Sequence, residues 1–322
     1  MILDMEKEYV VGVDVGGQTA KIGVVNRRGE ILCQKSIDSK YGKGEADKFV
    51  KALCSTIREL VKKIGLESVN GIGIGAPDGN FYKGTIEDAS NLQWAKGIIV
   101  PFAEMISKEL GGVKTVVTND ANAAAMGEMT YGAAKGMKDF IMITLGTGVG
   151  SGIVIGGNVV YGHDGFAGEL GHTCAVRTNG RECGCGKKGC LEAYTSATGV
   201  ARTAKEWMVN SLKPSILRDI KGDITSKDIY DAAEKGDKMA IEIFEYTGRI
   251  LGEKFADFVA FSAPEAIVLF GGLAHASKYI MKSLTDAMNE NLISLWKGKV
   301  KIITSALKES DAAILGASAL AW

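Results

Sequence analysis

The sequence lacks several features that would place it in other classes of protein. Only 4 of its 322 residues are proline, so it offers few rigid linkers. Its 38 basic residues are balanced by 38 acidic ones, which leaves no excess positive charge for nucleic acid. It has no low-complexity segment and no apolar run long enough to cross a bilayer. We therefore expect a globular protein that binds neither nucleic acid nor membrane.

Two further shortages concern the compartment. Residues 1–8 are acidic and lack the basic and apolar blocks of a signal peptide. The six cysteines are few for this length, and half of them are clustered, which fits a reducing compartment better than a disulfide scaffold. We expect the protein to be cytoplasmic.

The sequence also argues against two common nucleotide-binding motifs. The pattern GxxxxGK[ST] does not occur, which argues against a Walker-type nucleotidase. The dinucleotide pattern GxGxxG does not occur around residues 16–19 or 146–152, and a strand is predicted after Gly152, where that pattern requires a helix.

Glycine, in contrast, is abundant at 42 residues, and it punctuates a mixed pattern of strands and helices. Each half of the chain is predicted to open with a hairpin around a glycine-rich turn, at residues 16–19 and 146–152. This is a weak internal repeat of architecture. Helices are predicted at 192–208, 226–235 and 238–262, and Ser310 is predicted to cap a final helix. The pattern indicates α/β layers.

The glycine turns could hold phosphate, because such turns expose backbone N–H groups. Asp14, just before the first turn, could hold a hydrated Mg²⁺, and Thr19 could bond a phosphate oxygen. The second turn offers the hydroxyls of Thr147 and Ser151. The alternative is that both turns are simple hairpins. Against it, the pair Gly271-Gly272 likewise follows a predicted strand, at 267–270.

A candidate catalytic base lies at the end of the strand predicted over 113–118. Asn119 and Asp120 follow this strand and precede a helix. Either side chain could be a helix N-cap. In the functional interpretation, Asp120 accepts the proton of a substrate hydroxyl as that oxygen attacks a γ-phosphate.

A candidate metal site is formed by His172, Cys183, Cys185 and Cys190. One imidazole and three thiolates can close a tetrahedral zinc site, and four protein ligands leave no open position, so the zinc would be structural. A disulfide and a reduced loop are the alternatives. Glu169 and Glu192 flank the cluster, which suggests that the metal holds something functional in place.

Several of these motifs together resemble the ROK family of repressors, uncharacterised reading frames and sugar kinases. They are Asp14-Val-Gly-Gly-Gln-Thr19, Asn119-Asp120-Ala-Asn122, Leu145-Gly-Thr-Gly-Val-Gly-Ser-Gly152, Gly168-Glu-Leu-Gly-His172 and Cys183-Gly-Cys-Gly-Lys-Lys-Gly-Cys190-Leu-Glu192. The motifs occur in the family's order and span nearly the whole chain. The resemblance implies an actin-like, hexokinase-type fold of two α/β domains around a central cleft. It also implies transfer of the γ-phosphate of ATP to a hexose, with ATP, Mg²⁺ and a structural Zn²⁺.

The resemblance also assigns roles to individual residues. It makes Asp120 the catalytic base and His172, Cys183, Cys185 and Cys190 the zinc ligands. The hexose ligands would be Gly75, Asn91, Asn119, Asp120, Glu169, His172 and Glu192. The residues at the ATP phosphates would be Asp14, Gly16, Gly17, Gln18, Thr19, Gly146, Thr147 and Gly148, with Gly271 and Gly272 in the adenosine region. The chain departs from the family pattern at Gln18, since DxGGTK is commoner, and at residues 75–80, where PGPVD is commoner.

The resemblance leads to a specific set of expectations. A small domain would comprise residues 1–118 and 309–322, and a large domain residues 119–308. The substrate would be glucose, phosphorylated on its 6-hydroxyl as in glycolysis, with N-acetylmannosamine, N-acetylglucosamine, mannose and fructose as alternatives. A sugar-responsive repressor is the remaining alternative, but only eight residues precede the first strand, which leaves no room for a DNA-binding domain. A homo-oligomer, dimer or tetramer, is expected by analogy.

Overall fold

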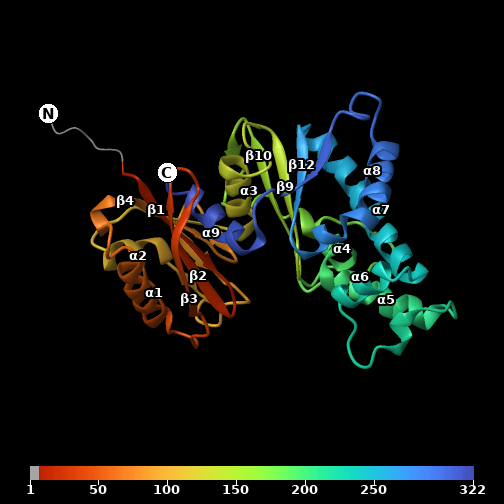
Figure 1. The fold of residues 1–322 in the computed structure, drawn as a ribbon, viewed down its shortest axis with the longest axis horizontal. Helices are drawn as coiled ribbons and strands as arrows, with labels where there is room; N and C mark the ends of the chain where they lie inside the picture. Colours follow the sequence, from red (N-terminus) through yellow and green to blue (C-terminus); the bar gives the residue numbers. More distant parts are fainter. Residues whose placement is uncertain (1–6) are drawn as a thin grey trace. The chain divides into compact units, whose positions relative to one another are not determined.

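The computed structural model describes residues 7–322 and contains two compact units (Figure 1). Unit 1 consists of the described residues up to Lys138, together with Gly152–Gly168 and Ser305–Trp322. Unit 2 consists of Asp139–Ser151 and Glu169–Thr304. Each unit combines helices with a sheet. The predicted domain boundaries, at 118/119 and 308/309, stay a prediction.

The main sheet of unit 1 has the strand order β3-β2-β1-β4-β8. Its strands are β1 (Tyr9–Val15), β2 (Thr19–Asn26), β3 (Ile31–Asp38), β4 (Val69–Gly75) and β8 (Thr115–Thr118). The first three form an antiparallel meander, whereas β1, β4 and β8 are parallel. A small antiparallel sheet contains β5 (Gly79–Asn80), β6 (Thr85–Glu87) and β7 (Ile99–Val100). The parallel strands align their carboxyl ends along one edge of the main sheet.

Four helices of unit 1 pack with this sheet: α1 (Ala46–Leu60), α2 (Phe102–Glu109), α3 (Asp120–Tyr131) and α9 (Glu309–Ala319). Helix α9 lies against β1 and β4. Two glycines allow the close approach, since a Cβ on Gly12 or Gly73 would overlap a carbonyl oxygen of Ile314 or Ala317. The C-terminal helix is thereby tied to the N-terminal sheet.

The sheet of unit 2 has β9 (Phe140–Leu145), β12 (Ala266–Phe270) and β13 (Lys301–Thr304) as parallel neighbours. The full strand order is β11-β10-β9-β12-β13, in which β10 (Val149–Ile155) forms a hairpin with β11 (Asn158–Val159), a strand whose residues belong to unit 1. The boundary between the two units falls inside β10. The residues of β9 and β12 are almost all buried, as expected for parallel strands covered on both faces.

The helices of unit 2 are α4 (Glu192–Thr195), α5 (Ala197–Asn210), α6 (Ser226–Glu234), α7 (Lys238–Ser262) and α8 (Ser277–Asn291). Short 3₁₀ turns lie at Leu66–Ser68 in unit 1, and at Leu170–His172, Ile216–Asp219 and Gly272–Ala276 in unit 2. Helix α7 has the predicted bounds. It packs closely on α8, because a Cβ on Gly252 would overlap the Leu284 carbonyl oxygen.

Several local predictions were wrong. The helix predicted at 192–208 is two helices, since Ser196 adopts an extended conformation and caps α5 by accepting the Gly199 N–H at 3.1 Å. The final helix begins at Glu309 with Lys308 at its N-cap, so Ser310 is not the cap. The second turn is shorter than predicted because β10 already begins at Val149. Helix α8 was not predicted, although Ile280, Leu284 and Met288 have helical spacing and are buried.

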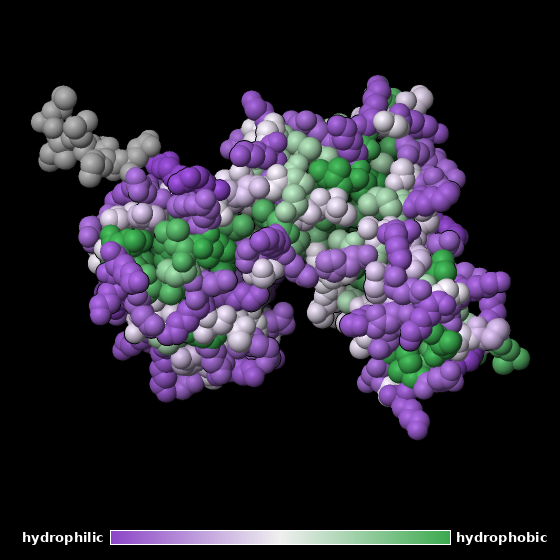
Figure 2. Space-filling model, viewed as in Figure 1, coloured by the Kyte–Doolittle hydropathy of each residue, from purple (hydrophilic) through white to green (hydrophobic). Residues whose placement is uncertain are grey.

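The visible surface is largely hydrophilic, with hydrophobic patches (Figure 2). One such patch lies at the end of α5 and the loop after it, where Val209 and Leu212 are 85% and 99% exposed. Within residues 7–322 there is no helix that combines the length and the apolar character needed to cross a membrane.

Candidate active site

The carboxyl ends of the parallel strands of unit 1 bring together residues that are far apart in the sequence. Asp14 of β1 pairs with Gly75 of β4, and Gly75 pairs with Thr118 of β8. Asn119 and Asp120 follow Thr118 directly. A Cβ on Gly75 would lie 3.6 Å from the Asp120 Cα, so a bulky residue there would crowd the start of α3. The fold therefore gathers Asp14, Gly75 and Asp120 at one edge.

The first glycine turn lies at the same edge. The Gly16 N–H donates to the Thr19 carbonyl at 3.0 Å and closes the turn. Buried Ser39 fixes it from the side: its hydroxyl donates to the Gly16 carbonyl at 2.6 Å and its N–H to the Gln18 carbonyl at 3.1 Å. Within the described part of the chain, the N–H groups of Gly17 and Gln18 donate no hydrogen bond. Such groups can bind an anion.

Asn91 lies beside this turn, as a shared site would require. A Cβ on Gly17 would lie 2.8 Å from the Asn91 carbonyl oxygen and 3.7 Å from its Cβ. The sequence alone could not show this proximity, because no local pattern links the two residues. Ser39, unlike Asn91, was not predicted as a site residue, and only its two hydrogen bonds to the turn show that it supports the site.

The start of α3 resolves one alternative. Asn119 is the N-cap, and its Oδ1 accepts the Ala121 N–H at 2.8 Å. Asp120 is the first helical residue, and its Oδ1 accepts the same N–H at 2.8 Å. The helix is therefore capped without Asp120. The position of Asp120 is compatible with a role in chemistry.

The carboxyl groups at this edge are electrostatically unusual. The pKa of Asp14 is raised to about 6, first by burial and then by the charge of Asp120, while Lys21 opposes both. Dehydration by surrounding protein atoms raises the pKa of Asp120, and its hydrogen bond from Ala121 opposes this. Asp78, which was not predicted as a site residue, also has a raised pKa, from desolvation and then from the charge of Asp120. Converging carboxylates with raised pKa values are typical of functional sites and of cation sites.

In unit 2, the second glycine turn connects β9 to β10. The Gly146 N–H donates to the Gly148 carbonyl at 3.0 Å. The Val149 N–H donates to Glu192 Oε2 at 2.9 Å, and the Gly150 N–H to Thr144 Oγ1 at 3.1 Å. Among residues 7–322, no acceptor takes the N–H groups of Thr147 and Gly148, so these two can receive an anion.

Two predicted residues have clear positions relative to this turn. Gly271 lies next to the strand end that precedes it: a Cβ on Gly271 would lie 2.7 Å from the Leu145 carbonyl oxygen, and its φ of 99° favours glycine. Gly272 follows at the start of a 3₁₀ turn. Ser151, in contrast, is buried within β10 and its Oγ accepts the Leu170 N–H at 3.0 Å. The prediction that Ser151 offers a hydroxyl in the turn was wrong.

The four predicted metal ligands of unit 2 converge. The ligand atoms of His172, Cys183, Cys185 and Cys190 all lie within 4.8 Å of one another. The Cys183 Sγ lies 3.8 Å from His172 Nδ1, and the Cys185 and Cys190 Sγ atoms lie 3.7 Å apart. A tetrahedral zinc ion with Zn–S bonds of about 2.3 Å separates its sulfur ligands by about 3.8 Å. The donor set and its spacing therefore fit zinc.

The thiols do not support the disulfide alternative. All six cysteines are free, and a separation of 3.7 Å is far longer than a disulfide bond of about 2.05 Å. Cys174 was overlooked as a neighbour of the cluster. Its backbone forms an isolated antiparallel β-bridge with that of Cys190, yet its sulfur is not part of the converging group.

The imidazole of His172 faces two ways. Its Nδ1 is directed at the thiol cluster, and its Nε2 lies 4.0 Å from Glu169 Oε2. On the other side of the cluster, Glu192 Oε1 lies 3.6 Å from the Cys183 Sγ. Metal ligation by Nδ1 would leave Nε2 directed toward Glu169, available for a polar ligand.

A buried cation anchors the loop that carries these ligands. Arg181 is 8% exposed and donates hydrogen bonds to Glu206, Thr203 Oγ1 and the carbonyl groups of Ala193 and Gly199. Its guanidinium also stacks on the Tyr194 ring, 4.5 Å from the centroid. The sequence pattern gave no indication of this residue's role.

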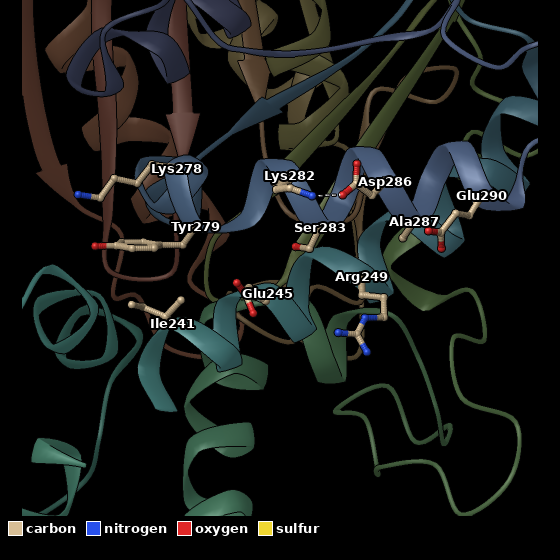
Figure 3. A pocket seen from close by; sticks show the side chains of 10 residues that line it. All are labelled: Ile241, Glu245, Arg249, Lys278, Tyr279, Lys282, Ser283, Asp286, Ala287 and Glu290. Atoms are coloured by element: carbon tan, nitrogen blue, oxygen red, sulfur yellow. Dashed lines mark hydrogen bonds and ion pairs between the residues drawn. The ribbon is translucent and has the colours of Figure 1, made fainter. Parts of the chain in front are cut away.

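A separate pocket of about 420 Å³ lies on unit 2 along α7 and α8 (Figure 3). Its charged lining is balanced, with three basic side chains and three acidic ones: Arg249, Lys278, Lys282, Glu245, Asp286 and Glu290. Lys282 and Asp286 pair with each other. None of the predicted site residues lines it.

Comparison with known proteins identifies the family. The model of the ROK family matches residues 10–322. The chain belongs to the ROK family.

Individual relatives fall on both functional branches of the family. A glucokinase of Halalkalibacterium halodurans is 35% identical over 291 residues, which cover 87% of this chain and 85% of the relative. A Streptomyces griseus ROK glucokinase, solved with glucose and AMPPNP, is 31% identical with a TM-score of 0.77, over 97% of this chain and 98% of that one. A ROK transcriptional regulator, homologous to the Escherichia coli MLC protein, has a TM-score of 0.85 at 25% identity, over 97% of this chain and 77% of that one. The predicted actin-like, hexokinase-type fold class is confirmed.

Proposed function

We propose that this protein is an ATP-dependent hexose kinase that transfers the γ-phosphate of ATP to the 6-hydroxyl of glucose. The similarity to glucokinases over nearly the whole chain supports an ATP-dependent sugar kinase. The observation that carries the finer proposal is the gathering of Asp14, Gly75 and Asp120 beside a glycine turn with two available N–H groups.

In the proposed reaction, Asp120 is the general base. The glucose 6-oxygen attacks the γ-phosphorus and forms the new P–O bond, while the bond to the β–γ bridging oxygen breaks and ADP leaves. The hydroxyl proton passes to the Asp120 carboxylate. A raised pKa makes this carboxyl a stronger proton acceptor than an ordinary aspartate. Since phosphoryl transfer needs little covalent help, positioning of the two substrates supplies much of the rate.

The remaining polar residues are assigned to the two substrates. Asn91, Asn119, Glu169, His172 and Glu192 would bind sugar hydroxyls, and Gly75 would leave room for the ring. The first turn and residues 146–148 would hold phosphate oxygens, with Gly271 and Gly272 near the adenosine. Asp14 would hold a hydrated Mg²⁺, which would neutralise charge on the phosphates. A structural Zn²⁺ on His172 and the three cysteines would fix the imidazole that faces the sugar.

We also propose the wider setting of this activity. The enzyme would act in the cytoplasm as a homo-oligomer, a dimer or a tetramer, and supply glucose 6-phosphate to glycolysis. The small domain would be residues 1–118 with 309–322, and the large domain residues 119–308.

A panel of hexoses tests the proposal. ADP release is measured with glucose, mannose, fructose, N-acetylglucosamine and N-acetylmannosamine, with zinc quantified on the same sample. We expect the highest kcat/KM with glucose and about one zinc per chain. A higher kcat/KM for an N-acetylated sugar would reassign the substrate, and no ADP release with any sugar would overturn the kinase proposal.

A further inference from the structure

The second glycine turn is held in place by the segment that follows the metal cluster. Three contacts connect them: the Val149 N–H donates to Glu192 Oε2 at 2.9 Å, the Ala197 N–H to the Gly146 carbonyl at 2.8 Å, and the Thr198 hydroxyl to the Thr147 carbonyl at 3.1 Å. Residues 192–198 thus contact both sides of a turn that would hold phosphate. Of the three, only the contact from Glu192 is made by a charged side chain.

Glu192 is in turn connected to the cluster. It follows the ligand Cys190 by two residues, and the Ala193 N–H donates to the Cys190 carbonyl at 3.1 Å. Its Oε1 lies 3.6 Å from the Cys183 Sγ while its Oε2 accepts the Val149 N–H. One carboxylate therefore bridges the metal ligands and the turn.

Gly148 provides the space for this bridge. A Cβ on Gly148 would overlap Glu192 Oε2, so the carboxylate occupies the volume that a side chain at residue 148 would take. With the Val149 N–H engaged by Glu192, the neighbouring N–H groups of Thr147 and Gly148 are left available. One N–H of the turn, that of Val149, is therefore used to hold its shape, and the N–H groups of Thr147 and Gly148 can bind a phosphate.

From this arrangement we infer that Glu192 is a positioning residue for the phosphate turn, through which occupancy of the metal site sets nucleotide affinity. The inference rests on the proposed kinase function and adds a role for the metal that is separate from sugar binding. Fixing Cys190 on the ion fixes the start of the segment from which Glu192 projects two residues later, and fixing Cys183 holds the sulfur that lies 3.6 Å from Glu192 Oε1. Loss of the ion frees that segment, so the Val149 N–H loses its acceptor and the turn loses its shape.

The test compares nucleotide binding with and without the metal. Binding of a non-hydrolysable ATP analogue in the presence of Mg²⁺ is measured by calorimetry on the full chain, before and after zinc removal by a chelator. A hydrogen bond to a charged group predicts that zinc removal weakens binding about tenfold in the wild type. The variant E192A should bind about tenfold more weakly from the start, and zinc removal should change its affinity by less than about twofold.

Three variants separate this role from a general structural one. E192Q keeps a side-chain carbonyl that can accept the Val149 N–H, so its nucleotide affinity should stay within about threefold of wild type. G148A displaces the carboxylate and should resemble E192A while retaining its zinc. G184A is the matched control, because its Cβ would meet no atom within 4 Å, and it should bind nucleotide as the wild type does.

The outcomes also distinguish this inference from the proposed function. If the zinc-loaded wild type binds no nucleotide, both are overturned. If it binds nucleotide equally well after zinc removal, or if E192A retains wild-type affinity, the kinase proposal survives and the coupling is wrong. Circular dichroism, recorded on each variant and on the zinc-free protein, reports whether the protein is still folded.

Discussion

Both glycine turns leave two backbone N–H groups available for an anion, but different parts of the chain stabilise them. The first, at residues 16–19, belongs to a hairpin and is fixed by the hydroxyl and N–H of Ser39, with acidic residues beside it. The second, at residues 146–148, depends on a carboxylate and two backbone contacts from the segment after the metal cluster. One turn is thus stabilised by its own sheet, and the other by a loop that carries the candidate metal ligands and is anchored by the buried Arg181.

The largest effect is expected beside the first turn, at the proposed base. Asp120→Asn should lower kcat by about 10²–10⁴-fold, because the amide cannot accept the hydroxyl proton, while glucose still binds. ADP release gives kcat, and calorimetry gives the glucose affinity. Asp78→Asn is the control for a loss of negative charge at this edge, and it should keep most of the activity. Turnover near wild type in Asp120→Asn would mean that another group is the base.

For the second turn, the largest effect on stability is expected from the buried Arg181, which anchors the loop that supports the turn. Arg181→Met removes a buried donor from Glu206 and from three other acceptors, and should lower the free energy of unfolding by about 3 kcal/mol. Arg202→Met removes a surface pair to the same Glu206 and should cost less than about 1 kcal/mol. Urea unfolding compares the two variants, and equal losses would show that burial of Arg181 contributes nothing.

The acidic residues beside the first turn should lower stability in a pH-dependent way. Asp14 keeps its proton in the folded state up to about pH 6, whereas the unfolded chain releases it near 3.8, so stability falls as pH rises through this window. Asp14→Asn should therefore raise the free energy of unfolding above pH 6, by up to about 3 kcal/mol, and lower kinase activity.

The control for this prediction is the pH profile itself. Below pH 3.8 both states of the wild type carry a protonated Asp14, so the gain from Asp14→Asn should vanish there. A gain that is constant with pH would point to packing and not to the carboxyl charge.

The smallest effect in this series concerns metal ligation. Cys185→Ser should lower zinc content and weaken glucose binding together, by about tenfold or more, because His172 is no longer fixed. Cys174→Ser is the matched control, since its sulfur lies outside the converging group, and its zinc content should stay at the wild-type level. Metal loss with unchanged glucose affinity would separate the cluster from the sugar.

Local patterns in the sequence identified the residues, but not what holds them. The four metal ligands were predicted from CxC, a nearby Cys and a lone His, and the structure brings their ligand atoms together. The contacts of Asn91 with Gly17 and of Glu192 with Val149 depend on chain segments that meet only after folding. Even the helix caps were decided by details beyond residue type, as Asn119 caps α3 whereas Ser310 does not cap α9.

The central claim is that glucose is phosphorylated on its 6-hydroxyl with ATP as donor. The most direct measurement is NMR spectroscopy of the product formed from ATP and ¹³C-labelled glucose by the zinc-loaded protein. We expect glucose 6-phosphate and one ADP for each phosphate transferred. Phosphate on another hydroxyl, or ADP formed without a sugar phosphate, would contradict it.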